Sequence, residues 1–385
     1  MQLYYVAHTA LDLPIRERFL QDISAIIATY LPVRALVRLQ MKRTLLTFMW
    51  IVLGLIIVSM VILLINHAIV KARYDKIDTA TNELSVKEIS QIAALYDRVA
   101  EEGNDIFPGL SDSDIDLLLF NDAYEFLVTD QAVESSWECL GWNDSLQKYI
   151  YRCPAAQSQA FAVNTNGNWV ASLSTQDTLN KYVLDSMSDD LGFFSIFVPP
   201  QFFETDDAYY QGLLIHEMIH VLQANACEDR FLAASSLQGV CSIYNSDSNF
   251  TTGLQEEGEY LELALHADTR EDTILYAEKF LAARLDRRTE CQLTAEEIED
   301  EKNLEWLEGT ARYAEYIASS DSNCLIRKNM GDISEKVAVQ SDDRYYSLGM
   351  AEALLLDKLK YDWKSEALSS DFIFEDALSL AISAA

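Results

Sequence analysis

The chain has 385 residues, of which 61 are Asp or Glu and 29 are Lys or Arg, so its formal net charge is −32. Only four of these acids but nine of these bases lie before residue 77, which leaves a net charge of −37 on the rest. A domain of that sign repels phosphates and is excluded as a binder of nucleic-acid backbones. We interpret the acidity as a means of keeping an exterior domain soluble.

An uncharged run rich in Leu, Ile, Val, Phe and Met extends from Thr44 to Ile65. Its length is about that of a helix crossing a bilayer. Basic residues stand on both sides of it: Arg34, Arg38, Lys42 and Arg43 precede, and Lys71, Arg73 and Lys76 follow, diluted by Asp75 and Asp78. The bias predicts a cytoplasmic N-terminus, so the rest of the chain is expected in the periplasm or outside the cell.

These features divide the chain into a cytoplasmic segment (1–43), a membrane anchor (44–65), a juxtamembrane stretch with a helix (66–104) and a main domain (105–385). Because Met41-Lys42-Arg43 resembles the start of a signal anchor, we hypothesise that translation begins at Met41 and that residues 1–40 are not translated. A signal peptide cleaved near residues 70–72 is the alternative, although the apolar run is long for one.

All six cysteines follow the apolar run, and an even number on the exterior side predicts disulfides. Sequential pairing is the simplest of the fifteen possible connectivities. It would join Cys139 to Cys153, Cys227 to Cys241, and Cys291 to Cys324.

Short strand patterns precede helical ones in the main domain. A helix is expected at 85–102, started by the capping box of Ser85 and Glu88 and stopped by Gly103. Strands are expected at 124–128, 161–163, 169–173 and 193–198, with a hairpin turn at 166–167 and the last strand at a sheet edge. Helices are expected from 206 onward, including 254–266, 272–288 and 345–359. The order predicts an α+β fold with a helix beneath a sheet edge.

The most informative segment is His216-Glu217-Met218-Ile219-His220, in an apolar helix that Asp206 or Asp207 would cap. Residues four apart share a helix face, so His216 and His220 can bind one metal ion. Glu217 then stands where a general base would act on a water molecule. The alternative is a core helix that carries two histidines by chance.

A zinc site needs a third protein ligand. Acidic candidates occur at Gln255–Tyr260 and at Glu305–Tyr316, and spacing alone does not choose between these stretches.

The second stretch, Trp306-Leu307-Glu308-Gly309 followed by Ala311, Tyr313, Glu315 and Tyr316, resembles the third-ligand helix of the aminopeptidase-N-like gluzincins. Tyr345-Tyr346-Ser347-Leu348-Gly349 is similar to the segment that supplies their oxyanion-stabilising tyrosine. The resemblance implies a zincin-like fold with one zinc per chain, in which Glu308 is the third ligand and Tyr346 the oxyanion donor. The Gly-x-Met-Glu-Asn segment with which those aminopeptidases hold a free amine is absent.

The residues themselves also favour Glu308. The capping box of Thr294 and Glu297 starts a helix expected to run to Ser319. On that helix Glu305 or Glu315 could accept a hydrogen bond from a ligand histidine. Gly309 is costly within a helix and therefore needs a packing reason. The alternative for this face is a solvated stripe in which Glu308 pairs with Arg312.

These observations predict a membrane-anchored zinc metallopeptidase that hydrolyses peptide or protein substrates. His216, His220 and Glu308 would bind zinc, Glu217 would act as the base, and Tyr346 would stabilise the oxyanion. Two alternatives stay open: a zinc hydrolase of a non-peptide bond, and a binding protein that keeps zinc without catalysis. Substrate identity, endopeptidase or exopeptidase specificity, and oligomeric state do not follow from the sequence.

Overall fold

The computed structural model describes residues 13–133, 136–156, 159–165, 167–192, 195, 199, 204–237, 247–339 and 341–384, with side chains from residue 40 onward. It is 64% helical and contains one six-stranded mixed sheet, which confirms the expected α+β class. Backbone contacts divide the chain into two compact units, Met1–Ile69 with Ile196–Pro199, and Val70–Ser195 with Pro200–Ala385.

The first long helix, α2 (Leu13–Tyr74), contains the apolar run. Its part from Gln40 to Tyr74 is long and apolar enough to cross a membrane, and nearly all of its large apolar side chains between Leu45 and Ile65 are exposed. Exposure of so many aliphatic side chains to water is unfavourable, and a bilayer would remove that cost.

Helix α3 (Val86–Ile106) begins at the predicted capping box, in which Ser85 and Glu88 bond each other's backbone. Its predicted end at Gly103 was wrong, because the helix continues for three more residues. Gly103 serves packing instead: a Cβ there would lie 2.8 Å from the hydroxyl of Ser111, which folds back over the helix. The buried face of α3, with Ile92 and Leu95, joins the main core.

The sheet has the strand order β3-β4-β2-β1-β6-β5. Its strands are β1 (Leu117–Phe120), β2 (Tyr124–Thr129), β3 (Glu138–Asn143), β4 (Lys148–Pro154), β5 (Phe161–Thr165) and β6 (Asn168–Ser174). Strands β1 and β6 are parallel and the other pairs are antiparallel. The sequence predicted β2, β5 and β6. It missed β1 and the β3–β4 hairpin, whose pairing shifts register near Gly141.

The predicted hairpin between β5 and β6 is confirmed by the pairing of Thr165 with Asn168, and Gly167 has a positive φ of 86°. The edge strand expected at Phe193–Val198 lies outside the described residues apart from Ser195. Strand β5 forms the described edge on this side of the sheet.

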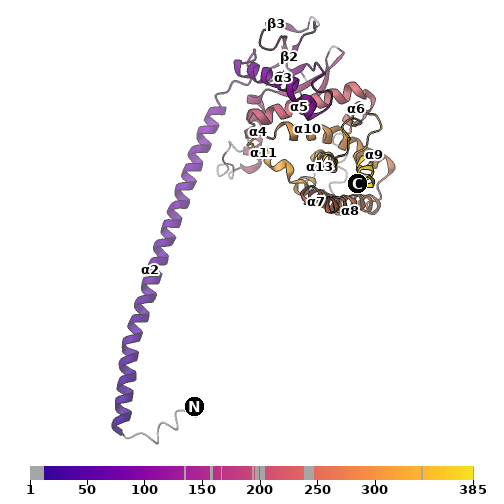
Figure 1. Cartoon of the computed structure of the whole chain (residues 1–385). Coiled ribbons are helices and arrows are strands. Elements are labelled where there is room, and N and C mark those ends of the chain that lie inside the picture. The colour runs from indigo at the N-terminus through magenta and orange to yellow at the C-terminus, as the bar shows by residue number, and fades with distance from the viewer. Residues whose placement is uncertain are drawn as a thin grey trace. The chain divides into compact units, whose positions relative to one another are not determined.

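Alternate residues of each strand face opposite sides of the sheet. Leu117 and Leu119 belong to the main core, whereas Leu118 belongs to a small apolar cluster with Leu127 and Val170. Helix α5 (Asp207–Ala226) contacts β5 and β6, so it lies against the edge of the sheet as expected. In Figure 1 this helix lies between the strands and the C-terminal helices.

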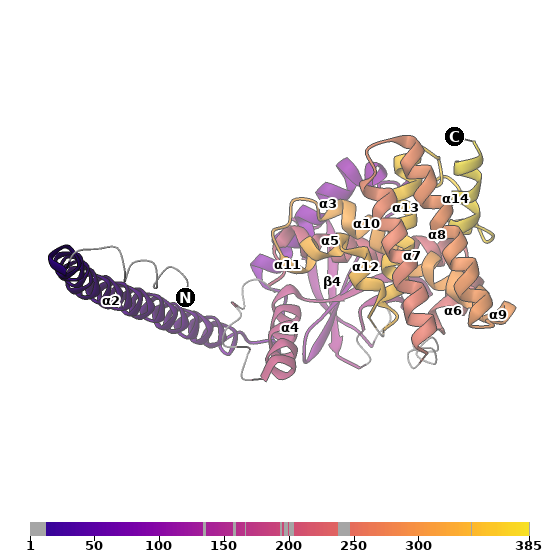
Figure 2. The same cartoon turned by 90° about the horizontal axis from the view of Figure 1, so that it is seen from below.

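The remaining helices follow mainly after the sheet, and α7, α8, α12 and α13 lie together beside it in Figure 2. They are α4 (Gln176–Leu191), α6 (Glu228–Ser235), α7 (Ser248–His266), α8 (Arg270–Glu290), α9 (Ala295–Leu304), the π-helical turn η4 (Glu305–Gly309), α10 (Thr310–Ala318), α11 (Leu325–Lys328), the 3₁₀ turn η5 (Asn329–Gly331), α12 (Ile333–Val337), α13 (Asp343–Leu359) and α14 (Phe374–Ser383). The predicted helices correspond to α5, α7, α8 and α13, whereas α4 was missed.

Two of the expected disulfides do not form in the structure. Cys139 pairs across the β3–β4 ladder with Tyr151, and the thiol of Cys153 donates to Glu125 on the other side of β4. Cys291 and Cys324 are also free. The third pair includes Cys241, which lies outside the described residues. Among the described cysteines, none lies within disulfide distance of another.

A largely buried cluster of three arginines and five glutamates, here called the arginine–glutamate cluster, joins five helices and η4. Its members are Arg284, Arg287, Arg288, Glu257, Glu301, Glu305, Glu352 and Glu375. Paired charges are tolerated in a protein interior, whereas removal of one partner leaves an uncompensated buried charge. The cluster therefore ties the α7–α8 pair to η4, where the third candidate ligand lies.

Candidate metal centre

Helix α5 holds the two histidines and the candidate base in the protein interior. Its first turn is capped by Asp206, whose carboxylate accepts from the backbone N–H of Tyr209. His216, Glu217 and His220 are all buried, among Leu214, Ile215, Met218 and Ile219. Three buried polar side chains in an aliphatic helix need partners, because an unpaired polar group in the interior is costly.

Glu308 lies on a π-helical turn and not on the regular helix expected at this position. The residues from Ala295 to Ala318 form one continuous helical run, in which η4 interrupts α9 and α10. Single π turns inside α-helices are frequent at functional sites, because they displace side chains from the regular helical register.

A close helix crossing explains the glycine that follows Glu308. A Cβ at Gly309 would lie 2.4 Å from the Cα of Gly349 on α13, and one at Gly349 would lie 2.5 Å from the carbonyl oxygen of Glu305. The packing reason expected for Gly309 is therefore confirmed. The contact is between two backbones, which neither helix can relieve by turning a side chain.

Gly349→Ala is expected to destabilise the protein by about 1–3 kcal/mol and to weaken metal binding, since the added methyl group pushes η4 away from α13. The control is Gly331→Ala, where the new Cβ would meet nothing closer than 3.7 Å. Thermal unfolding and zinc titration of both variants provide the measurement. Equal effects of the two substitutions would contradict the packing argument.

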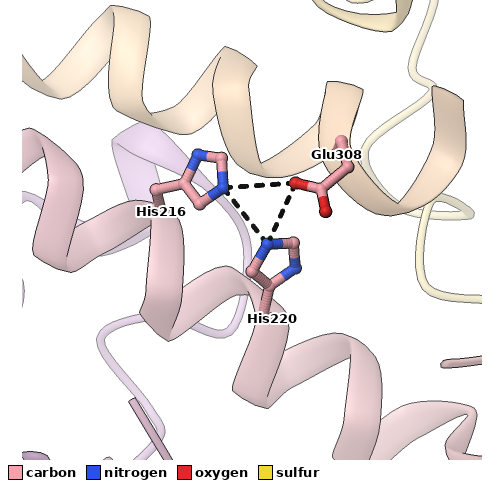
Figure 3. Close-up of side chains that lie close together, drawn as sticks. All are labelled: His216, His220 and Glu308. Atoms are coloured by element: carbon pink, nitrogen blue, oxygen red, sulfur yellow. Dashed lines mark hydrogen bonds and ion pairs between the residues drawn. The ribbon is translucent and has the colours of Figure 1, made fainter. Parts of the chain in front are cut away.

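Figure 3 shows His216 and His220 of α5 pointing toward Glu308 on the facing helix. The Nε2 atoms of the two histidines are 3.1 Å apart, and Oε2 of Glu308 lies 3.5 Å from Nε2 of His216 and 3.4 Å from that of His220. Zinc–ligand bonds of about 2.0–2.1 Å at tetrahedral angles put ligand atoms roughly 3.3 Å apart. The three atoms thus have the spacing of one face of a zinc tetrahedron.

Hydrogen bonds on the far sides of the rings orient both histidines. Nδ1 of His216 lies 3.0 Å from Oε2 of Glu315, and Nδ1 of His220 lies 2.9 Å from Oε1 of Gln223. The amide of Gln223 is itself oriented, because its Nε2 donates to the carbonyl oxygens of Trp306 and Leu307. Both acceptors require a proton on Nδ1, so each neutral ring presents the lone pair of Nε2 to the centre.

Two imidazole lone pairs and a carboxylate oxygen therefore converge within 3.5 Å of one another. With both rings neutral, all three atoms are acceptors, so the arrangement becomes favourable when a positive charge, either a proton or a metal ion, lies between them. Burial opposes protonation of His216, but the carboxylates of Glu308 and Glu315 outweigh it and raise the pKa of His216 to about 9. The donor set of two imidazoles and one carboxylate suits zinc and leaves a position for water.

Glu217 is the next residue of α5 after His216, and burial raises its pKa to about 7, against the lowering effect of the two histidines. Its Oε2 atom has no hydrogen-bond partner among the described residues. A buried carboxylate oxygen without a partner is rare in folded proteins. A water molecule activated at the metal centre would satisfy it, so this atom also fits an occupied metal site.

Glu315 has the orienting role that the sequence left open between Glu305 and Glu315. Burial would raise its pKa, but Arg312 and His216 outweigh burial and keep that pKa below its ordinary value. The alternative pair of Glu308 with Arg312 is not the one that forms: Nη1 of Arg312 lies 3.0 Å from Oε1 of Glu315.

Glu315→Gln is expected to weaken zinc binding about 10–100-fold, because a neutral amide supports the ligand His216 less well than a carboxylate does. Competition with a chromophoric chelator measures this affinity. Glu138→Gln is the matched control, since it also removes a carboxylate that pairs with an arginine, Arg152, but on the sheet. Unchanged zinc affinity in Glu315→Gln would rule out the orienting role.

The two candidate ligand histidines have different surroundings. The ring of His216 is stacked on that of Tyr346, with centroids 6.0 Å apart, whereas the ring of His220 contacts Phe161 of β5 at 4.6 Å. Burial and the nearby carboxylate of Glu308 raise the pKa of Tyr346, so its phenol remains a hydrogen-bond donor at neutral pH. The structure therefore brings the predicted oxyanion donor to the centre.

The other candidates lie elsewhere. Glu257, from the alternative third-ligand stretch, bonds Arg284 and Arg287 in the arginine–glutamate cluster, and Glu305 also bonds Arg284. His266 is on α7, where its Nδ1 lies 2.9 Å from the carbonyl oxygen of Glu262. Sequence reasoning missed Gln223, although its position three residues after His220 on the same helix face was an available signal.

Among the described residues, the only group of three or more His, Cys, Asp or Glu side chains arranged to hold a metal ion is His216, His220 and Glu308. Comparison of the chain with protein-family models, with curated proteins and with solved structures finds no match.

Proposed function

We propose that the protein is a zinc-dependent metallopeptidase anchored to a membrane by one helix. The observation that carries this proposal is the convergence of three buried acceptor atoms, two Nε2 and one Oε2, within 3.5 Å of one another. A carboxyl oxygen of Glu217 without a partner adjoins them on α5. A purely structural zinc site needs no base beside the metal.

The metal would act as a Lewis acid that activates a water molecule and polarises the scissile carbonyl. Glu217 takes a proton from the attacking water and passes it to the leaving amine, for which a pKa of about 7 is well matched. The phenol of Tyr346 donates a hydrogen bond to the developing oxyanion. Glu315 and Gln223 hold the imidazole rings in the tautomer that binds a metal.

A peptide is the substrate that the surroundings favour. Among the described strands, β5 is an edge of the sheet; it contacts α5, and its residue Phe161 lies against the ring of His220. An unpaired strand edge can hold an extended peptide by main-chain hydrogen bonds. This arrangement would align a peptide bond along the two ligand histidines.

We place the catalytic unit outside the cytoplasm. Helix α2 is long and apolar enough to cross a membrane between Gln40 and Tyr74. Four basic residues precede the uncharged run that begins at Thr44, and three, diluted by Asp75 and Asp78, follow it, a bias that favours a cytoplasmic N-terminus.

The test is metal analysis and hydrolysis with the full chain in detergent. One zinc per chain is expected by plasma mass spectrometry, together with cleavage of random-sequence peptides that a chelator abolishes and added zinc restores. Absence of metal after gentle purification would leave His216 and His220 as core residues and remove the proposal. Bound zinc without any cleavage would favour the alternative of a binding protein that keeps zinc without catalysis.

A further inference from the structure

Arg312 on α10 connects the metal centre to the oxyanion donor. One of its guanidinium nitrogens, Nη1, donates to Oε1 of Glu315, whose other oxygen accepts from His216. The guanidinium carbon lies 4.9 Å from the ring centroid of Tyr346, so the cation also stacks on that ring. These two contacts hold Arg312 in one place beside the site.

Most of the hydrogen-bonding capacity of Arg312 is unused. A guanidinium group carries five N–H donors, and among the described residues Glu315 is the only acceptor bonded to this one. Its side chain is 21% exposed, whereas the carboxylate of Glu315 is fully buried. The group is thus a fixed cation whose side chain is partly open to solvent.

The stacking contacts limit how far this cation can lie from the metal centre. The guanidinium stacks on Tyr346, and Tyr346 stacks on His216, so these contacts in series put it at most about 11 Å from the imidazole ring. An extended chain covers that distance in roughly three residues. A group of the substrate one to three residues from the scissile bond can therefore reach Arg312.

Because the guanidinium of Arg312 is positively charged, the substrate group that it binds is expected to be an anion. Arginine binds carboxylates through parallel hydrogen bonds, a geometry that gives both affinity and orientation. In a chain with a net charge of −32, free acidic peptides are repelled in general, and a fixed cation beside the site counteracts this locally.

We propose that Arg312 is a substrate-binding residue that holds a carboxylate one to three residues from the scissile bond. The carboxylate is the α-carboxylate of a peptide C-terminus or the side chain of an Asp or Glu residue. This inference rests on the proposed peptidase function and specifies its substrate class, and the test separates the two.

Three pools of N-acetylated random octapeptides test the proposal with the full chain in detergent. The first has free C-termini, the second has C-terminal amides, and the third has C-terminal amides and no Asp or Glu. The wild type is expected to cleave the first pool, the second, or both at least about tenfold faster than the third. Faster cleavage of the first pool than of the second identifies the α-carboxylate. Faster cleavage of the second pool than of the third identifies the side chain of Asp or Glu.

Arg312→Gln is expected to bring the cleavage rates of all three pools to within about twofold of one another while zinc remains bound. Arg312→Lys should restore part of the preference because it keeps the charge. Arg327→Gln is the matched control: that arginine also stacks on a tyrosine, Tyr316, at 3.7 Å, but on α11 away from the metal centre, so it should leave the preference intact.

Equal cleavage of the three pools by the wild type would overturn the role of Arg312 and leave the peptidase proposal standing. The role of Arg312 would also be overturned if Arg312→Gln slowed the cleavage of all three pools by the same factor. That result would assign Arg312 to positioning Glu315 and Tyr346. Failure of the zinc-loaded wild type to cleave any pool would overturn both proposals.

Discussion

Glu217→Gln is expected to keep one zinc per chain and to lower kcat by about 10²–10⁴-fold. The amide has nearly the shape of the carboxylate but cannot accept a proton from the attacking water. Because Glu217 bonds none of the three candidate ligands, the geometry that holds the metal is unaffected. Zinc analysis and peptide hydrolysis on the same preparation measure the two effects separately.

The control for this variant is Glu228→Gln. That glutamate is exposed just beyond the end of α5, where it accepts from the indole N–H of Trp169. It should hydrolyse peptides at the wild-type rate. Unimpaired turnover in Glu217→Gln would exclude the general-base mechanism, even if the protein binds zinc.

Glu308→Ala is expected to lose both the metal and the activity. Two histidines alone leave zinc without its third protein ligand, and the loss of the carboxylate also removes the charge that the site offers a cation. Metal analysis should find almost no zinc in this variant, and His216→Ala should behave in the same way. Retention of one zinc per chain in Glu308→Ala would show that a different residue completes the site.

The control for Glu308→Ala must be chosen with the interior charges in mind. Glu257→Ala is unsuitable, because it would remove a buried carboxylate that bonds both Arg284 and Arg287 and so destabilise the fold for an unrelated reason. Glu299→Ala on α9 is suitable, since that side chain is exposed. It should keep its zinc and its activity.

Local signals in the sequence predicted much of the fold. The capping boxes at Ser85 and Thr294 started helices where expected, and the Asn-Gly signal gave the hairpin of β5 and β6. The β3–β4 hairpin was missed because its pairing shifts register, with Gly141 at a positive φ of 124°. The pairing of β3 with β4 depends on the rest of the sheet and not on a pattern within either strand.

For the site, the helical spacing of His216 and His220 was sufficient to place two ligands on one face. The resemblance and Gly309 already favoured Glu308 as the third ligand, and the structure brings this residue to the two histidines. Glu257 also stands in a stretch rich in glutamate, and only the packing of α8 shows that arginines neutralise it. Gln223 could have been found from its helical spacing, but the π turn at η4 and the carbonyl oxygens of Trp306 and Leu307 that orient its amide are tertiary features that no local pattern records.

The ligands come from two helices that are far apart in sequence, and the intervening chain from 221 to 307 includes the whole α7–α8 pair. A metal bound by His220 and Glu308 is therefore a cross-link that closes a long loop in the folded chain, and because unfolding releases it, its binding free energy adds to the stability of the fold. Zinc at a thousand times its Kd would add about 4 kcal/mol to the free energy of unfolding. The described part of this protein, which contains no disulfide, would then depend on metal supply for its thermal stability as well as for its chemistry.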